Sequence, residues 1–599
     1  MPAVLSNMSP LDNPPQVVLA ALRTLSSITE AAELSPSSSA STATLAEQFF
    51  GPLCLDAFHS ILASESLTAA AQEQKRLVAD LISRLCREDK HQNALAQYGI
   101  LDALATMLAS FVVARGEVIP GAEVLGRADG MDEMIPDPAP RSSNLAVTLD
   151  AISTIISESR FRTCMLIYSP AIMAVFPNAE FSPPRGARTL RRAMDMAGIT
   201  NLRKNSPEAI EYLLPIVPVC HLKSAAPQVP QFPPLGFSLS RENLATAGRT
   251  NPKLFPVWDP TRVGSPTSNG GDADLDETES PLVPWLIHLV RSAGDLERVM
   301  AASVLASLFK AGFADPQRES AIGNLVVPVL CHLIKEANLE ATSTSSDVKL
   351  LEPRVALNRA VLERSPTVLA RLIAGSELLQ VCAHGCGIVK TVCSLLFGAY
   401  EPVLEQSPPR PWSPVVDEPV DRGEGYWTSR MGPPGYLPIY SHRLKLREGA
   451  LKLIAAIIPL KEEIRMAFVE QDAVPYIVES LSPTPTKPKH IKDRAKPERA
   501  AVRDKGTSTE TSPYGANPNS VIIAACHVIR LLSRSISILR TSLEDHGVAV
   551  PIFKLLRHSD KDVQVAACAV VCNLVLEMSP MRQVSRMFPS SSDDSFRED

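Results

Sequence analysis

The feature that most constrains this chain is a short phrase of helical sequence that recurs along it. In the stretch VQVAACAVVCNLVLE, Ala567, Val571 and Leu574 fall on one face at the 3.6-residue period of an α-helix, and the polar Asn573 stands just before the leucine. The same order of small, branched, polar and leucine residues begins at Ala524, which is 43 residues upstream. Two predicted helices with the same residue pattern, 43 residues apart, indicate a repeated structural unit.

Further copies of the phrase extend this repetition toward the N-terminus. Clear copies begin at Ala450, Ala301 and Val78, looser copies begin at Thr148 and Ser365, and a first copy surrounds residues 22–25. Chance amphipathic helices supply one or two matches of this kind, whereas this chain holds eight in all. We therefore interpret the chain as an array of repeats.

Each unit of the array is a break, a short helix, a turn and a long helix. In the last unit, residues 547–551 contain Gly and Pro and interrupt the helix, residues 552–556 form the short helix, and residues 558–560 form a turn that can cap the long helix. Similar breaks occur at residues 98–101, 385–388 and 472–475. Units of ~40–47 residues in this order are typical of armadillo repeats, which bury their apolar faces only by stacking. The predicted fold is an all-α, armadillo-repeat, right-handed superhelical solenoid.

Insertions separate the groups of repeats and account for the 51 prolines. We expect armadillo repeats at residues 1–114, 145–175, 281–400, 442–481 and 521–580. Between and after them we expect an acidic loop at 115–144, a Pro-rich and largely disordered insertion at 176–280 with one helix pair at 188–196 and 207–214, an aromatic and Pro-rich loop at 401–441, a basic disordered loop at 482–520 and a disordered tail at 581–599.

Composition narrows the classes of partner. The chain of 599 residues has a net charge of −6 and is 45% hydrophobic, with no apolar run near the ~18–20 residues of a membrane span. Its N-terminus has no basic start followed by an apolar stretch, so no secretory signal is expected. Most of the 11 cysteines lie in apolar helical runs, which is the usage of a reduced intracellular protein. We expect protein partners, and no nucleic acid, membrane, small-molecule substrate or cofactor.

The polar residue of the recurring phrase is the candidate partner-binding position. In an armadillo array the long helices line a concave groove, and this residue points into it. Armadillo proteins use Asn there to hydrogen-bond an extended peptide, but only the last copy in this chain has Asn, so general importin-like peptide binding is disfavoured. The groove residues expected to bind a partner are Arg84, Ser307, Arg371, Arg530 and Asn573.

Three of these five residues are arginines, which favour acidic or carboxylate-ended partners through bidentate pairing. The alternative is that the arginines are solvated or pair with neighbouring acids. The equivalent residues in the other copies, Thr24, Thr154 and Ala456, carry no charge.

Other conspicuous residues have simpler explanations. The run CAHGC at residues 382–386, together with Cys393, resembles a metal site but lacks a fourth ligand, so buried thiols and a turn histidine are favoured and no metal is expected. Cys568 and Cys572 share a helix face and are interpreted as core residues.

Two insertions carry residues that suggest binding or regulation. The basic segment 487–505, with Ser482 and Thr484 before prolines, has the composition of a nuclear-import or phosphoregulated segment, although a solvated disordered linker is the favoured interpretation. Around Tyr426 and Trp427, exposed aromatics either pack on the array or anchor a partner.

Catalytic motifs are absent from the sequence. It contains no GxxxxGK[ST], GxGxxG, HExxH or GxSxG, and its 11 histidines show no shared spacing with acids. We therefore expect no enzyme, and an enzyme hidden in residues 176–280 is a distant alternative.

Three stretches are more specific than a general armadillo pattern. They are AACHVIRLLSRS at 524–535 followed by LRTSL at 539–543, ACAVVCNLVLEMSP at 567–580, and RLIAGSELLQ at 371–380. They closely resemble the armadillo subunit of the GID/CTLH E3 ubiquitin ligase, the vacuolar import and degradation family of fungi and its animal counterparts. The resemblance extends over most of the helical chain and is strongest at about 351 to 580.

This resemblance implies a non-catalytic scaffold in the cytoplasm and nucleus. In the family, the subunit binds the ligase core and presents an exchangeable substrate receptor, whose C-terminal tail lies in the armadillo groove, while RING subunits transfer ubiquitin to metabolic enzymes destined for the proteasome. An anionic chain end in the groove would agree with Arg371 and Arg530. One departure is that the family continues with further repeats after Pro580, where this chain has a Ser/Asp-rich tail. The alternative function is an unrelated armadillo adaptor in nuclear transport or signalling.

Overall fold

A computed structural model describes ten segments of the chain, namely residues 2–34, 41–119, 135–176, 214–215, 279–315, 318–343, 353–402, 438–488, 513–535 and 538–574. All of them belong to one unit, formed by residues 1–217 and 279–599. Every regular element in these segments is an α-helix. The expected helix pair at 188–196 and 207–214, the aromatics at 426–427, the basic segment at 487–505 and the tail at 581–599 fall outside the described residues, apart from residues 214 and 487–488.

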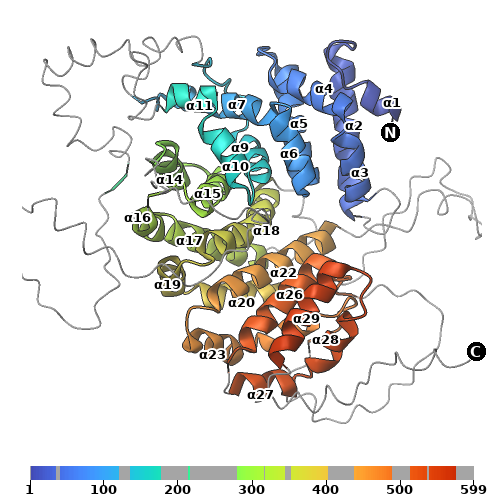
Figure 1. The fold of residues 1–599 in the computed structure, drawn as a ribbon, viewed down its shortest axis with the longest axis vertical. Coiled ribbons are helices and arrows are strands. Elements are labelled where there is room, and N and C mark those ends of the chain that lie inside the picture. Colours follow the sequence, from blue (N-terminus) through green and yellow to red (C-terminus); the bar gives the residue numbers. More distant parts are fainter. Residues whose placement is uncertain are drawn as a thin grey trace, which may run out of the picture. The chain divides into compact units, whose positions relative to one another are not determined.

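Eight long helices form a continuous series in which each helix packs against the next. They are α2 (Pro15–Leu34), α5 (Ala69–Leu85), α9 (Leu145–Ile155), α15 (Asp295–Lys310), α18 (Pro353–Ile373), α22 (Pro438–Ile457), α26 (Asn519–Leu532) and α29 (Lys561–Leu574). Each of them contains one of the eight copies of the recurring phrase. We call this series the ladder; Figure 1 shows it from blue at α2 to red at α29. The predicted all-α armadillo-repeat fold is confirmed.

Other helices complete the repeats beside the ladder. They are α1 (Pro2–Ser6), α3 (Thr42–Phe49), α4 (Pro52–Leu62), α6 (Asp89–Gln97), α7 (Ile100–Arg115), α10 (Arg160–Ile167), α11 (Pro170–Val175), α14 (Leu282–Ser292), α16 (Arg318–Leu325), α17 (Val327–Ser343), α19 (Glu377–Gly385), α20 (Ile388–Gly398), α23 (Glu462–Glu470), α24 (Val474–Glu479), α27 (Ile538–Asp545) and α28 (Ala549–Leu555). Most helices of the ladder are therefore preceded by two further helices, as in armadillo units.

The predicted breaks are left-handed turns between the first two helices of a repeat. Gly99, Gly387 and Gly547 have φ of 74°, 73° and 69°, and Asp472 has φ of 56° at the equivalent place. Residues with a Cβ rarely adopt this conformation, so glycine is favoured there. The turn predicted to cap the last long helix also forms, because Asp560 accepts a hydrogen bond from the backbone N–H of Asp562 at 2.8 Å.

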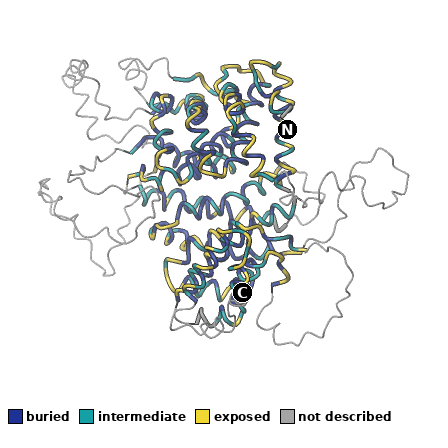
Figure 2. Tube along the Cα trace, turned by 45° about the vertical axis from the view of Figure 1, so that its right-hand side comes forward, coloured by how far each residue is buried: buried dark blue, intermediate teal, exposed yellow. Residues whose placement is uncertain are grey.

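One connected apolar core runs through the described helices from Met8 to Leu574. Figure 2 shows its buried residues, in dark blue, along the stacked helices. The helix α15 illustrates how completely a middle helix is covered, since all ten residues from 299 to 308 are buried. Such a core arises because each repeat buries its apolar face against its neighbours.

Arg447 in α22 joins segments that flank two of the predicted insertions. Its buried guanidinium donates to the carbonyl of Ala399 at 2.9 Å, to Asn517 Oδ1 at 2.9 Å and to the carbonyl of Tyr514 at 2.7 Å. It also lies over the ring of Tyr400, 4.0 Å from the centroid. Residues at the ends of the predicted insertions 401–441 and 482–520 are thus hydrogen-bonded to the buried guanidinium of Arg447.

By length and composition alone, one described helical stretch, Arg318–Glu340, would cross a membrane. Two further bent pairs, α6 with α7 and α19 with α20, would qualify only if each pair were counted as one span, and they bend by 72° and 75°. The sequence analysis expected no such stretch. In the structure, half of the most apolar window of Arg318–Glu340 is buried, and Val327, Leu330 and Ile334 are fully covered by neighbouring helices.

Candidate functional site

The candidate site is the side of the ladder that carries the recurring polar residues. The five predicted groove residues lie on five different long helices, α5, α15, α18, α26 and α29. Whether they bind a partner stays a prediction, and their surroundings differ widely. Ser307 in α15 is buried and donates its hydroxyl to the carbonyl of Ser303 at 3.3 Å, so it is covered by its own neighbours.

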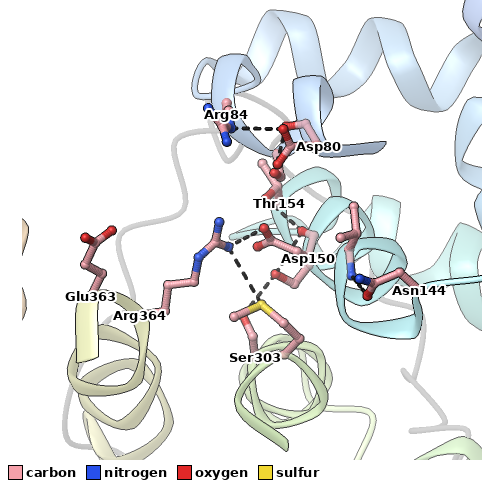
Figure 3. A network of polar contacts seen from close by, with 12 residues as sticks. Asp80, Arg84, Asn144, Asp150, Thr154, Ser303, Glu363 and Arg364 are labelled. Atoms are coloured by element: carbon pink, nitrogen blue, oxygen red, sulfur yellow. Dashed lines mark hydrogen bonds and ion pairs between the residues drawn. The ribbon is translucent and has the colours of Figure 1, made fainter. Parts of the chain in front are cut away.

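Arg84 is already paired with acids of the ladder. Its guanidinium lies 3.1 Å from Asp80 on the same helix and 3.5 Å from Glu30 of α2. Burial lowers the pKa of Arg84, but the carboxylates of Asp80, Glu33 and Glu30 outweigh it and raise the pKa. Figure 3 shows the pairing with Asp80. A partner's carboxylate would have to replace one of these acids.

Arg371 is only partly hydrogen-bonded. One terminal nitrogen donates to the carbonyl of Ser303 at 2.8 Å and to its hydroxyl at 2.6 Å. The Nε atom is buried and has no hydrogen-bond partner. Burial lowers the pKa of Arg371, and Asp150 and Glu158 only partly oppose this. Its position favours an additional anion, because a buried cation is stabilised by an opposite charge.

A network of charges between α9, α18 and α22 lies beside these residues. Arg364 pairs with Asp150 and lies 3.8 Å from Met300 Sδ (Figure 3). The neighbouring Glu363 lies 2.8 Å from His442 Nδ1 and 3.2 Å from Lys445 Nζ, both on α22. Burial alone raises the pKa of Glu363, but its hydrogen bond with His442 and the charge of Lys445 lower it to about 2. The sequence analysis missed this network because it followed a single position of each phrase.

At the C-terminal end of the ladder, the predicted groove cation is Arg530 of α26, which has no paired carboxylate among the described residues. Asn573 Nδ2 donates to the carbonyl of Arg530 at 2.9 Å, exactly one 43-residue period away. No carboxylate of the described residues pairs with the half-buried guanidinium of Arg530. Burial and the nearby charges of Arg530 and Lys452 lower the pKa of His527. Lys452 pairs with Glu448 at 2.6 Å. Of these groups, Lys452 is thus neutralised by Glu448, whereas Arg530 has no paired carboxylate among the described residues.

Comparisons with known proteins identify relatives of the chain. No family model matches it. It is 27% identical to GID complex subunit 5 of Schizosaccharomyces pombe over 303 residues, which cover 50% of this chain and 30% of that protein. It is 31% identical to armadillo repeat-containing protein 8 of Xenopus laevis over 143 residues, which cover 24% of this chain and 15% of that protein.

The chain is an armadillo-repeat relative of GID complex subunit 5. The resemblance drawn from the sequence is thereby confirmed. The matched regions span less than a third of the length of either curated relative.

Solved structures of designed proteins are also similar in part. Computationally designed armadillo repeat proteins for modular peptide recognition match 49% of this chain and 82% of their own, with 15% identity and a TM-score of 0.27. An engineered protein matches 95% of this chain and 98% of its own, with 14% identity and a TM-score of 0.30. The fold assignment rests on the helix contacts of the ladder and not on these scores.

The cysteines are placed differently from the prediction. Cys393 is buried, and burial raises its pKa to about 12, but Cys386 is exposed. Burial and the neighbouring thiols of Cys386 and Cys382 raise the pKa of Cys331 from α17, so a third thiol lies beside the two predicted ones. Sequence spacing could not show this, because α17 and α19 belong to two neighbouring repeats.

Cys568 and Cys572 were expected in the core, and this was wrong. Both are exposed on α29, beside Val565, whose side chain is 68% exposed. The reason is that α29 is the last long helix described, so only one of its neighbours in the ladder, α26, covers it.

One group of described residues meets the distances of a metal site. Glu47, Glu88 and the buried His91 place their ligand atoms within 4.8 Å of one another. Lys90 already pairs with both carboxylates, at 3.0 Å from Glu88, and therefore supplies the positive charge there. This cluster is explained as an ion-pair network between α3 and α6.

Proposed function

We propose that the chain is a non-catalytic scaffold of a GID/CTLH-type E3 ubiquitin ligase, which docks a substrate receptor on the ligase core. The observation that carries the proposal is the relation to GID complex subunit 5, together with a ladder of eight long helices that offers an extended face to other proteins. In this role the chain positions other subunits relative to one another and does not transfer ubiquitin itself. The substrates would be metabolic enzymes destined for the proteasome, and the chain would act in the cytoplasm and nucleus.

The charges of the ladder indicate where an acidic receptor tail would bind. Arg84 is paired with Asp80 and Glu30 in the unbound chain, so a receptor tail would first have to displace an acid there. Arg530 pairs with no carboxylate of the described residues, whereas Lys452 is already paired with Glu448. We therefore place receptor docking at α26 and α29, where Arg530 would pair with a carboxylate and Asn573 would fix the helix that carries it.

A charge reversal tests this proposal directly. The tagged full chain would be purified from its native cells as wild type, as Arg530→Glu and as the control Arg354→Glu, whose side chain is 78% exposed on α18. Quantitative mass spectrometry would then measure the recovered proteins. We expect all three forms to recover RING and LisH/CTLH-type subunits, and only Arg530→Glu to lose the receptor.

Two results would contradict the proposal. Equal receptor recovery by Arg530→Glu and the control would place docking elsewhere. Loss of both the core and the receptor with Arg530→Glu, but not with Arg354→Glu, would mean that this end of the ladder holds the whole complex or that the variant is misfolded. Circular dichroism of the purified variants separates these two cases.

A further inference from the structure

The first and the sixth long helices of the ladder touch each other directly. The C-terminal part of α2 packs against α22, although α5, α9, α15 and α18 lie between them in the series. Two distant repeats are thus in contact on the side of the ladder that carries the charged network. This contact is additional to the helix-to-helix stacking that an armadillo array needs.

An ion pair joins α2 to α22 at this contact. Glu33 at the end of α2 lies 3.6 Å from Lys445 of α22, and Lys445 also lies 3.2 Å from Glu363. One turn earlier, Glu30 lies 3.5 Å from Arg84 of α5. The C-terminal end of α2 therefore presents two acids, Glu30 and Glu33, to two cations on other helices of the ladder.

These two acids are unfavourable for the helix that carries them. The C-terminal end of a helix has a partial negative charge, so carboxylates there destabilise it and cations are preferred. The last turn of α2 contains no basic residue. The contribution of Glu30 and Glu33 to stability must therefore come from the cations opposite them and not from α2 itself.

The pairs are accessible and weak enough to exchange. The side chains of Glu30 and Lys445 are 63% and 43% exposed, and those of Arg84 and Glu33 are 24% and 17% exposed. Ion pairs in contact with solvent contribute little net stability, and salt screens them over about 8 Å at physiological ionic strength. An incoming carboxylate can therefore compete with them.

We propose that the acidic end of α2 is a built-in ligand of the ladder. It occupies Arg84 and Lys445 as an acidic segment of a partner protein would, and such a segment displaces it on binding. Arg84 and Lys445 then form a second site for an acidic segment, separate from the site at Arg530. The end of α2 masks this second site in the unbound chain. This inference applies to any protein partner and does not depend on the ligase assignment.

A double variant that neutralises the two acids tests the proposal. The full chain would be compared as wild type, as Glu30→Gln/Glu33→Gln and as the control Glu47→Gln/Glu73→Gln, which changes the net charge equally but alters pairs with Lys90 and Arg76. A fluorescein-labelled peptide of ten glutamates would serve as the probe, and fluorescence anisotropy would measure its affinity. We expect binding about threefold or more tighter in Glu30→Gln/Glu33→Gln, and no change in the control.

Two further measurements locate the effect. Adding Arg84→Gln and Lys445→Gln to the double variant should return the affinity to the wild-type value or below. Hydrogen exchange should become faster at residues 28–34 and 438–448 in Glu30→Gln/Glu33→Gln, and should stay unchanged in α26.

The proposal fails if the peptide binds Glu30→Gln/Glu33→Gln no more tightly than the wild type. Faster exchange with unchanged affinity would show that the contact is structural only. Tighter binding that survives the loss of Arg84 and Lys445 would place the acidic-segment site elsewhere and would also overturn the proposal.

Discussion

Replacing Arg447 by Met should loosen the C-terminal repeats. The side chain is fully buried and satisfies three buried acceptors, the carbonyls of Ala399 and Tyr514 and the amide oxygen of Asn517. Each acceptor left without a donor costs at least about 1 kcal/mol, and the lost contact with the ring of Tyr400 adds about 1 kcal/mol. Met retains the apolar stem and removes a buried charge, which offsets part of this cost. We expect a net loss of about 3 kcal/mol.

Hydrogen exchange followed by mass spectrometry is the suitable assay, because repeat arrays open locally and not in one step. A loss of about 3 kcal/mol corresponds to about a hundredfold faster exchange in residues 513–532. The matched control is Arg354→Met, since Arg354 is 78% exposed and its removal should change stability by less than about 0.5 kcal/mol. Equal exchange rates at 513–532 in the two variants would refute the role assigned to Arg447.

Three other variants or reactions test separate parts of the structure. In a urea titration, Gly99→Ala should cost about 1 to 2 kcal/mol, because φ is 74° and the new Cβ would lie 3.4 Å from the His59 ring, whereas Gly398→Ala at a helix end should be neutral or stabilising. Glu363→Gln should destabilise the chain most at pH 6, and the difference should shrink as the pH falls from 4.5 toward 2, because the folded pKa of about 2 lies below the ordinary value; a difference that grows on acidification would contradict this sign. Maleimide should label Cys386 quickly in the native chain and leave Cys526 unlabelled, since burial raises the pKa of Cys526 to about 12.

The ladder could be predicted from sequence because its information is local. The apolar period that begins at Ala567 defines a helix by itself, and the copy at Ala524 defines the repeat. The hydrogen bond from Asn573 to the carbonyl of Arg530 spans the same 43 residues as the two phrases. Breaks such as Gly547 could be predicted for a similar reason, since a left-handed turn restricts the residue that occupies it.

The pairing of charges could not be predicted. A helical pattern shows that Glu33 and Lys445 are polar, but not that helices of the first and sixth repeats meet. The sequence pattern also could not show which groove positions are buried. Ser307 occupies the polar position of its copy of the phrase, but residues 299–308 of α15 are all covered by neighbouring helices. Only the three-dimensional contacts distinguish such a position from the accessible Arg530.

The most direct test of the central claim is the composition of the complex that contains this chain. The tagged wild-type protein would be purified from its native cells, passed over a size-exclusion column and analysed by mass spectrometry. The account predicts that RING and LisH/CTLH-type subunits elute with the chain in one large complex, in stoichiometric amounts. Reproducible recovery of other proteins, with those subunits missing, would contradict the proposed role in a GID/CTLH-type ubiquitin ligase.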